Sequence, residues 1–503
     1  MADVDPTGTP APMPAPDAYA ILDSRAAGGR AMRGGMIRTG AFTGGLALGL
    51  LTAPLLVRHL GDVDFGRYLT VLAVVAIVTG LTEGGVNAVA MRALAAAGDD
   101  STRDRIMRDL LGLRLVLSVA GIVIAVGFAV IAGYDGELVL GTLCAGTGML
   151  LGVTQSLLGT VLQTRLRFGL ASAIDLARGA LTAALIVVLV LLGAGVVAFL
   201  VIIIPAALLS LLLTMWVLRG TTTLRPAFHP NRCLPLLRET AVFAVAVAVN
   251  SLYFRLTLVI MSLIATAEQT GHFAISFRVM EILIGIPAIL AGAAFPIIAR
   301  SARDDRERFD TATGRLFELC LLSGVLLSLA LTLAAPFIVE ILTGSATHPA
   351  TNVLRIQALA MTASFIAVAA GFPLLGLHRH RETLFANLAS LVVVVALALA
   401  LVPSHGAQGG AIAAVLADFT LAVANTLLLM RNGGPRLPLL AVPVALAAGG
   451  LGYLAGSLVG VHPLVEATVA VATFLAVLLA TRRFPPEVLE LLRSRRAPVV
   501  AGE

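Results

Sequence analysis

Lysine is absent from this 503-residue chain, so all 35 of its basic side chains other than histidine are arginines. Charge of either sign is scarce, because Asp, Glu and Arg together make up 13% of the residues, whereas 58% are hydrophobic. The mean hydropathy is +0.96, and soluble domains usually carry about 25% charged residues. These values exclude a soluble globular protein and predict a chain that crosses a membrane many times.

Several kinds of site are also missing. The three cysteines, Cys144, Cys233 and Cys320, are far apart, which argues against a disulfide framework and against a cysteine-based metal site. No P-loop or glycine-rich nucleotide cradle occurs, so bound ATP is not expected to supply energy. The connections between hydrophobic runs are too short for a soluble catalytic domain. We therefore expect no cofactor, no metal and no enzymatic activity.

Long hydrophobic runs, bounded by charged or Gly/Pro-rich breaks, are the dominant pattern. About 20 helical residues cross the roughly 30 Å of hydrocarbon in a bilayer. By this measure the sequence predicts an all-α, polytopic membrane protein of fourteen transmembrane helices. The expected spans are 36–57, 66–91, 110–132, 138–163, 170–192, 195–218, 239–264, 272–299, 314–337, 352–376, 383–402, 408–430, 438–459 and 462–481.

Arginine alternates between successive connections. Twenty-nine of the 35 arginines fall in or directly beside the two tails and the even-numbered connections, whereas the odd-numbered connections are nearly free of them. Because positive charge is retained on the cytoplasmic side, both termini are expected in the cytoplasm. The net charge of +6 therefore indicates a membrane surface and not a nucleic acid partner. Of the six exceptions, Arg58, Arg67 and Arg355 lie at outer helix ends, where we expect them to reach lipid headgroups.

A weak internal repeat divides the chain. Gly66-Arg67-Tyr68 opens the second span as Gly271-His272-Phe273 opens the eighth, at an offset of 205 residues. Six helices per unit would make two lobes related by a pseudo-twofold axis along the membrane normal, with a binding site between them. The expected parts are a disordered cytoplasmic tail (1–35), an N-lobe (36–218), an inter-lobe connection (219–238), a C-lobe (239–430), two appended helices (438–481) and a basic cytoplasmic tail (482–503).

Charge within the seventh and eighth spans marks the main candidate site. Arg255 and Glu281 each lie about 15 Å below the turn that joins the two spans, at a rise of about 1.5 Å per residue. Arg278 lies nearby in the eighth span. Charge at this depth is costly unless it is paired or faces water. The three residues therefore predict either a hydrated, function-bearing cavity or an Arg–Glu pair that locks two helices together.

Five further residues are candidates with a structural alternative. Arg178 suits either an inner anion contact or an anchor that reaches the interface. Glu83 is expected to pair with Arg38 or Arg92, or to bind ligand or a proton. Asp418 lies at a depth like that of Glu281, where it would pair with Arg255 or titrate. Asn250 and Gln155 suit either sugar contacts or helix–helix hydrogen bonds.

Several motifs resemble one family of transporters. Residues 60–68 read L-G-D-V-D-F-G-R-Y, similar to the L-G-x-x-x-F-G-x-Y turn of the polysaccharide transporter family, the Wzx-type flippases of lipid-linked oligosaccharides. Gly80 to Gly85, Tyr253-Phe254-Arg255, Phe295-Pro296 and Gly406 to Ala411 fit the same family, and the likeness covers about residues 36–430. Leu256, Thr257 and Leu258 stand where the family often has an acidic residue, so no cation-linked carboxylate is carried over to this stretch.

The resemblance implies two six-helix lobes around a central cavity and movement of an undecaprenyl-pyrophosphate-linked sugar from the inner to the outer leaflet of a bacterial plasma membrane. It implies membrane lipids and a lipid-linked glycan as partners, with a polysaccharide polymerase or glycosyltransferases as candidate protein partners. The arginines within the spans support part of this, because one guanidinium group can donate two parallel hydrogen bonds to the oxygens of a pyrophosphate. The alternative is a cation-coupled efflux transporter of the multidrug type, for which unpaired carboxylates would be expected.

Overall fold

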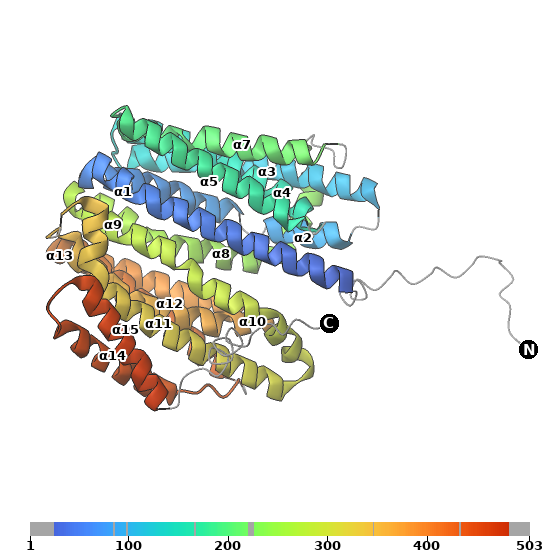
Figure 1. The fold of residues 1–503 in the computed structure, drawn as a ribbon. Coiled ribbons are helices and arrows are strands. Elements are labelled where there is room, and N and C mark those ends of the chain that lie inside the picture. Colours follow the sequence, from blue (N-terminus) through green and yellow to red (C-terminus); the bar gives the residue numbers. More distant parts are fainter. Residues whose placement is uncertain are drawn as a thin grey trace, which may run out of the picture.

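The computed structural model describes residues 25–83, 86–96, 99–164, 167–219, 226–345, 347–431 and 434–481, and these residues form helices and connections without a strand. The helices lie side by side along one common direction (Figure 1). They are α1 (Arg25–Glu83), α2 (Val86–Ala96), α3 (Asp100–Ile131), α4 (Gly136–Thr164), α5 (Phe168–Leu191), α6 (Val196–Val201), α7 (Ile203–Val217), α8 (Pro230–Ile264), α9 (Ala267–Leu283), α10 (Gly285–Asp304), α11 (Arg306–Thr343), α12 (Ala350–Gly376), α13 (His380–Met430), α14 (Ala441–Ser457) and α15 (Pro463–Ala480).

Two of these helices each contain a reversal of the chain. Helix α1 consists of two helices joined at Gly61, where φ is 69°, and α13 consists of two joined at Gly406, where φ is 53°. Glycine adopts positive φ without the clash that a Cβ would cause. In the described part of the chain, ten helices are long and apolar enough to cross a membrane, and two shorter apolar helices accompany them. With the two reversals counted, they match the fourteen expected spans, and the all-α membrane architecture is confirmed.

Two spans are broken for a common physical reason. Helix α6 ends at Val201, four residues before Pro205, and α9 ends at Leu283, four residues before Pro287. Proline has no N–H to donate to the carbonyl four residues earlier, and its ring crowds that carbonyl. The sixth and eighth spans are therefore pairs of helices, α6 with α7 and α9 with α10.

Several boundaries differ from those expected. Helix α1 begins at Arg25, so residues 25–35, expected in a disordered tail, are helical, whereas residues 1–24 and the tail 482–503 lie outside the described residues. Helix α8 begins at Pro230, inside the expected inter-lobe connection. Asp99 precedes α3 and accepts hydrogen bonds from Ser101 and from Thr102, which lower the pKa of Asp99 to about 2. Such a cap satisfies a free amide of the first helical turn.

The helices gather into two groups. Helices α1 to α7, called the first bundle here, pack on one another, as do α8 to α13, called the second bundle, while α14 and α15 pack on α11. Helix α1 packs on both bundles to a similar extent. The bundles meet where α1 lies against α8 and α9 (Figure 1). The predicted twofold relation between the bundles remains a prediction. Below, the arginine-rich end is the end where α3 begins and α12 ends, and the arginine-poor end is the one with the Gly61 and Gly406 reversals.

Candidate functional site

The second bundle contains a cavity of about 620 Å³, lined by residues of α8, α9, α12 and α13. Arg255 of α8 and Glu281, near the C-terminal end of α9, line its deep end. His380 and Thr383 line the opposite part, at the start of α13. The cavity therefore runs from the middle of the bundle toward the arginine-rich end.

Glu281 holds two arginines at the deep end. Nη2 of Arg255 donates to Oε1 of Glu281 over 2.9 Å, and Nη1 of Arg278 donates to Oε2 over 2.8 Å. Arg255 comes from α8, whereas Arg278 and Glu281 are three residues apart on α9 and so share a face of that helix. The three side chains are 23% to 31% exposed, so they are neither sealed nor free in solvent. Two guanidinium groups share one carboxylate, which leaves the cluster one positive charge.

Amide side chains supply neutral polar groups to the same cavity. Nδ2 of Asn250 donates to Oδ1 of Asn387 over 3.3 Å, and both residues line the cavity. Asn425 donates to the carbonyl oxygen of Ala367 over 3.1 Å, while its Oδ1 is buried without a hydrogen-bond partner. Each amide offers two donors and an acceptor, a combination that matches sugar hydroxyl groups. The structure thus places Asn250 in the cavity wall, hydrogen-bonded to Asn387.

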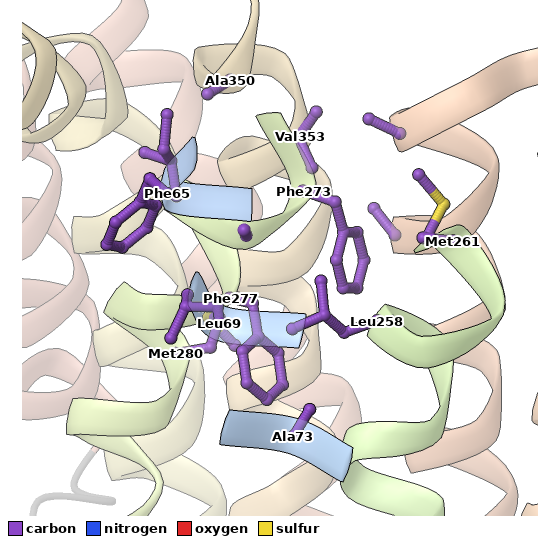
Figure 2. Packing of buried hydrophobic residues seen from close by; sticks show 14 of the residues in the cluster. Phe65, Leu69, Ala73, Leu258, Met261, Phe273, Phe277, Met280, Ala350 and Val353 are labelled. Carbon is purple, nitrogen blue, oxygen red and sulfur yellow. The ribbon is translucent and has the colours of Figure 1, made fainter. Parts of the chain in front are cut away.

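An apolar layer closes the space between this cavity and the arginine-poor end. Phe65 and Leu69 of α1 pack against Leu258 of α8 and against Phe273 and Phe277 of α9, and all five side chains are buried (Figure 2). The layer joins the two bundles, because α1 belongs to the first and α8 and α9 to the second. Interiors packed in this way leave few voids large enough for water. The layer therefore separates the cavity from the arginine-poor end.

Close backbone approach completes the seal. A Cβ on Gly66 would lie 2.9 Å from the nitrogen of Gly271, and one on Gly271 would lie 2.2 Å from the carbonyl oxygen of Asp62. These positions need glycine, because any side chain would push the two bundles apart. The hydroxyl groups of Tyr134 and Ser262 form a further hydrogen bond of 2.7 Å between the bundles. In this conformation the protein is closed at the arginine-poor end.

Two outer arginines contact protein groups, in place of the lipid headgroups expected for them. Nη2 of Arg58 donates to the carbonyl oxygen of Ile341 over 2.8 Å, which satisfies the last turn of α11 in the other bundle. Arg67 pairs with Asp135 of the connection between α3 and α4, and with Asp64 at 3.2 Å. Arg58 thus adds a polar contact between the bundles at the closed end.

Asp418 lies behind the cavity wall and not beside Arg255. Oγ of Ser364 donates to its Oδ2 over 3.5 Å, and the hydroxyl group of Tyr253 also hydrogen-bonds to this carboxylate. Asp418 borders a separate small cavity of about 30 Å³ in the second bundle. Of the two alternatives, the pair with Arg255 does not form in this structure, because Glu281 holds that arginine.

Glu83 has a partner that the sequence analysis did not name. Nη2 of Arg114, on α3, lies 3.3 Å from Oε1 of Glu83, and Nδ2 of Asn87 donates to the same oxygen over 2.8 Å. Arg114 lies at the start of the expected span 110–132, beside the arginine-rich second connection, and its side chain is 1% exposed. The side chains of Arg38 and Arg92, the expected partners, lie outside the described part. The position of Arg114 inside a hydrophobic span was the signal that could have identified it.

Gln155 and Arg178 do not line the 620 Å³ cavity. Nε2 of Gln155 donates to Oγ1 of Thr214 over 3.4 Å, which joins α4 to α7 inside the first bundle. Arg178 is exposed on α5, close to Gly152 of α4. Their positions match the structural alternatives more closely than the ligand-binding ones.

One group of polar residues gave no signal in the sequence. Asp62, His272 and His348 come together at the arginine-poor end, although His348 is 286 residues from Asp62. A ligand spacing in the sequence detects only residues that are close in the chain, whereas here the fold brings distant residues together.

Comparison with solved structures identifies the fold. The chain is similar to the inward closed conformation of the lipid II flippase MurJ, with a TM-score of 0.75, 11% identity and coverage of 89% of this chain and 99% of that chain. It is similar to the inward-facing conformation of a multidrug resistance MATE family transporter of the MOP superfamily, with a TM-score of 0.65, 17% identity and coverage of 76% and 93%. It is also similar to a MOP superfamily transporter from Pyrococcus furiosus, with a TM-score of 0.55, 17% identity and coverage of 79% of this chain and 92% of that chain.

At these identities the likeness establishes the fold alone. No curated protein matches the chain by sequence. The family model for polysaccharide biosynthesis proteins matches residues 32–302, more than half of the chain. The solved structures that resemble this chain are those of a flippase and a transporter. The chain is a multi-pass membrane protein that belongs to the polysaccharide biosynthesis protein family and has the fold of MOP superfamily transporters.

Proposed function

We propose that this protein is a flippase that moves a polyprenyl-pyrophosphate-linked oligosaccharide from the inner to the outer leaflet of the bacterial plasma membrane, and that it is a transporter without enzymatic activity. The observation that carries this proposal is the Arg255–Glu281–Arg278 cluster, of which Arg255 and Glu281 line the deep end of a cavity that also presents amide side chains, while Arg278 is bonded to Glu281.

The charge of the cluster suits an anionic passenger. Arg255 and Arg278 each have guanidinium donors that can hold phosphate oxygens in pairs, and charge-assisted hydrogen bonds are about twice as strong as neutral ones. Glu281 satisfies both arginines when the cavity is empty. A pyrophosphate would then replace Glu281 as acceptor, which keeps the arginines from being buried without a partner. A carboxylate already shared by two arginines offers little to an organic cation.

The size and polarity of the cavity suit the head group of the substrate. A volume of about 620 Å³ lies within the range of roughly 300–1,000 Å³ found for small-molecule sites. Asn250 and Asn387 would contact sugar hydroxyl groups, while the pyrophosphate lies at Arg255. A polyprenyl chain is too long for this space and would remain in the surrounding lipid.

The orientation follows from the arginines. We assign the arginine-rich end to the cytoplasm, so both termini would be cytoplasmic and the cavity would open toward the leaflet on which lipid-linked sugars are assembled. The apolar layer around Phe65 and Phe273 would close the outer side while substrate loads. Alternating access would follow if the two bundles rock about their interface. The N-lobe and C-lobe expected from the sequence would then be the two moving bodies.

The remaining candidates take supporting roles in this proposal. Glu83 with Arg114 would stabilise the first bundle, and Gln155 would join two of its helices. Asp418 hydrogen-bonds to Tyr253, which lines the cavity, so a bound substrate that moves Tyr253 would alter this hydrogen bond. Arg178 would anchor α5 at the membrane interface. Glycosyltransferases would supply the substrate and a polysaccharide polymerase would consume it.

The test is transport by purified protein in liposomes. A fluorescent polyprenyl-pyrophosphate sugar is placed in both leaflets, and a membrane-impermeant quencher reports which molecules have crossed. The proposal expects protein-dependent crossing of this lipid and no crossing of organic cations driven by a sodium or proton gradient. Gradient-driven transport of the cations, without crossing of the lipid, would replace the proposal with the cation-coupled efflux function.

A further inference from the structure

Asp62, His272 and His348 form a cluster that spans the two bundles at the arginine-poor end. Asp62 follows the Gly61 reversal of α1, His272 lies in the second turn of α9, and His348 lies in the connection between α11 and α12. The cluster is therefore built from one element of the first bundle and two of the second. It lies on the far side of the apolar layer from the 620 Å³ cavity, so it is separate from the proposed substrate site.

The geometry of the cluster is compact. Nε2 of His348 lies 2.9 Å from Oδ2 of Asp62, and Nε2 of His272 lies 3.2 Å from the same oxygen. One potential ligand atom from each of the three residues lies within 4.8 Å of the other two. The two rings meet edge to face, with centroids 5.2 Å apart. The side chains are 27%, 5% and 13% exposed for Asp62, His272 and His348, which leaves the group reachable and yet largely shielded from water.

We propose that Asp62, His272 and His348 bind a divalent transition-metal ion, with Zn²⁺ as the best match. Imidazole nitrogen and carboxylate oxygen are ligands that Zn²⁺ accepts, at about 2.0–2.2 Å in a tetrahedral arrangement. Two such ligands of one ion are separated by roughly 3.4 Å, close to the separations in this cluster. The cluster therefore needs a small expansion to admit an ion and no rearrangement of helices.

A fourth ligand is available. Oε1 of Glu268 lies 3.9 Å from Nε2 of His272, one helical turn earlier on α9, and its side chain is 71% exposed. This exposure lets Glu268 turn toward the ion from the solvent side. Water can occupy the same position, as in zinc sites with three protein ligands.

His348 has to change its hydrogen bonding to take part. The backbone N–H of Ala350 donates to Nδ1 of His348 over 3.2 Å, so in this arrangement the proton of a neutral ring lies on Nε2 and is donated to Asp62. An ion at Nε2 requires the other tautomer and the loss of the Ala350 contact. His348 lies outside a regular helix, so its ring can shift without unwinding one. His272 and Asp62 have no such competing contact among the described residues.

A bound ion would hold the bundles together at the closed end. It would bond to Asp62 of the first bundle and to His272 and His348 of the second, beside the close contact of Gly66 with Gly271. Opening this end would then require release of at least one ligand. Zn²⁺ is therefore expected to stabilise the conformation seen here.

The experiment measures metal binding directly and does not depend on transport. Tag-free protein in detergent, stripped with a chelator, is titrated with Zn²⁺ by calorimetry, and Co²⁺ is added separately to record its visible absorption. We expect one saturable Zn²⁺ site per chain, a Co²⁺ spectrum of four-coordinate type, and a higher unfolding temperature with Zn²⁺, because binding to the folded state stabilises it.

Asp62→Asn and His348→Gln are the test variants, and each should weaken Zn²⁺ binding at least ~10-fold, since even loss of a group that supports a metal ligand costs about that much. His405→Gln is the matched control, because His405 is an exposed histidine at the same end that contacts Ser404. Absence of saturable Zn²⁺ binding by the wild-type protein would overturn the proposal. So would affinity unchanged in both test variants, or a six-coordinate Co²⁺ spectrum.

Discussion

Nη2 of Arg255 lies 2.9 Å from Oε1 of Glu281, and this contact joins α8 to α9 at the deep end of the cavity. Because Arg278 binds the other oxygen of the same carboxylate, Glu281 restrains both arginines. A pyrophosphate that enters the cavity has to compete with Glu281 for these donors. In the proposed function, the contact would serve as an exchangeable pair, closed when the cavity is empty and opened by substrate.

Removal of the Glu281 charge should strengthen anion binding. In Glu281→Gln the competing carboxylate is lost while both guanidinium groups remain, so a polyprenyl pyrophosphate is expected to bind about 10-fold more tightly, equivalent to ~1.4 kcal/mol. The measurement is binding of the fluorescent lipid to detergent-solubilised protein at low and high salt. Glu307→Gln, at an exposed position in the first turn of α11, is the control. Weaker binding by Glu281→Gln would contradict the exchange model.

The amides should act on the sugar and not on the pyrophosphate. Asn250→Ala removes one side chain that can hydrogen-bond to a hydroxyl group, worth about 0.5–1.5 kcal/mol or roughly 2- to 12-fold in affinity. The loss is expected for the oligosaccharide-linked lipid and should be absent for the polyprenyl pyrophosphate without sugar. The two ligands are compared in the same binding measurement. An equal loss for both would place Asn250 at the pyrophosphate or assign it a structural role.

Contact between Gly66 and Gly271 should control closure of the arginine-poor end. In Gly271→Ala the new Cβ would lie 2.2 Å from the backbone oxygen of Asp62, so the bundles have to move apart. Overpacking of this kind costs about 1–3 kcal/mol, which is measurable as a lower unfolding temperature in detergent. Gly127→Ala on α3 is the control, because nothing lies within 4 Å of its Cβ position. Equal unfolding temperatures for the two variants would contradict the close packing.

The pair of Glu83 and Arg114 should respond unequally to loss of either partner. Glu83→Gln leaves Arg114, 1% exposed, buried without a compensating charge, which is expected to cost about 3–5 kcal/mol. Arg114→Met leaves Glu83, whose side chain is 35% exposed and can be solvated, so its cost should be smaller. Unfolding temperatures of the two variants in one detergent provide the comparison. A larger loss for Arg114→Met would show that packing of the long side chain outweighs its charge.

Much of the fold could be predicted because it depends on local properties of the chain. Hydropathy and the alternation of arginine located the spans, and the glycine at 61 and at 406 stands where the chain reverses. Helix ends were less predictable, since α1 and α8 extend by a few turns past their apolar stretches. The equal depth of Arg255 and Glu281 also followed from helical rise alone, and the structure brings these two residues into contact.

Contacts between distant parts of the chain could not be predicted in this way. Arg58 was expected at lipid headgroups, yet it donates to the end of α11, 283 residues away. The same limit applies to His348 and Asp62, which meet because the bundles pack. Composition and spacing describe what a segment contains, whereas the partner of a polar group depends on which helices pack together.

The most direct test of the central claim compares flipping rates of Arg255 variants in proteoliposomes. Arg255→Ala is expected to slow crossing of the polyprenyl-pyrophosphate sugar at least ~10-fold, since a hydrogen bond to a charged group is worth about 1.5–3 kcal/mol. Arg255→Lys, which keeps the charge and loses the paired donors, should fall between Arg255→Ala and the wild type. Arg355→Ala, at an exposed arginine near the start of α12, should flip at the wild-type rate. Crossing by correctly inserted Arg255→Ala at the wild-type rate would contradict the account.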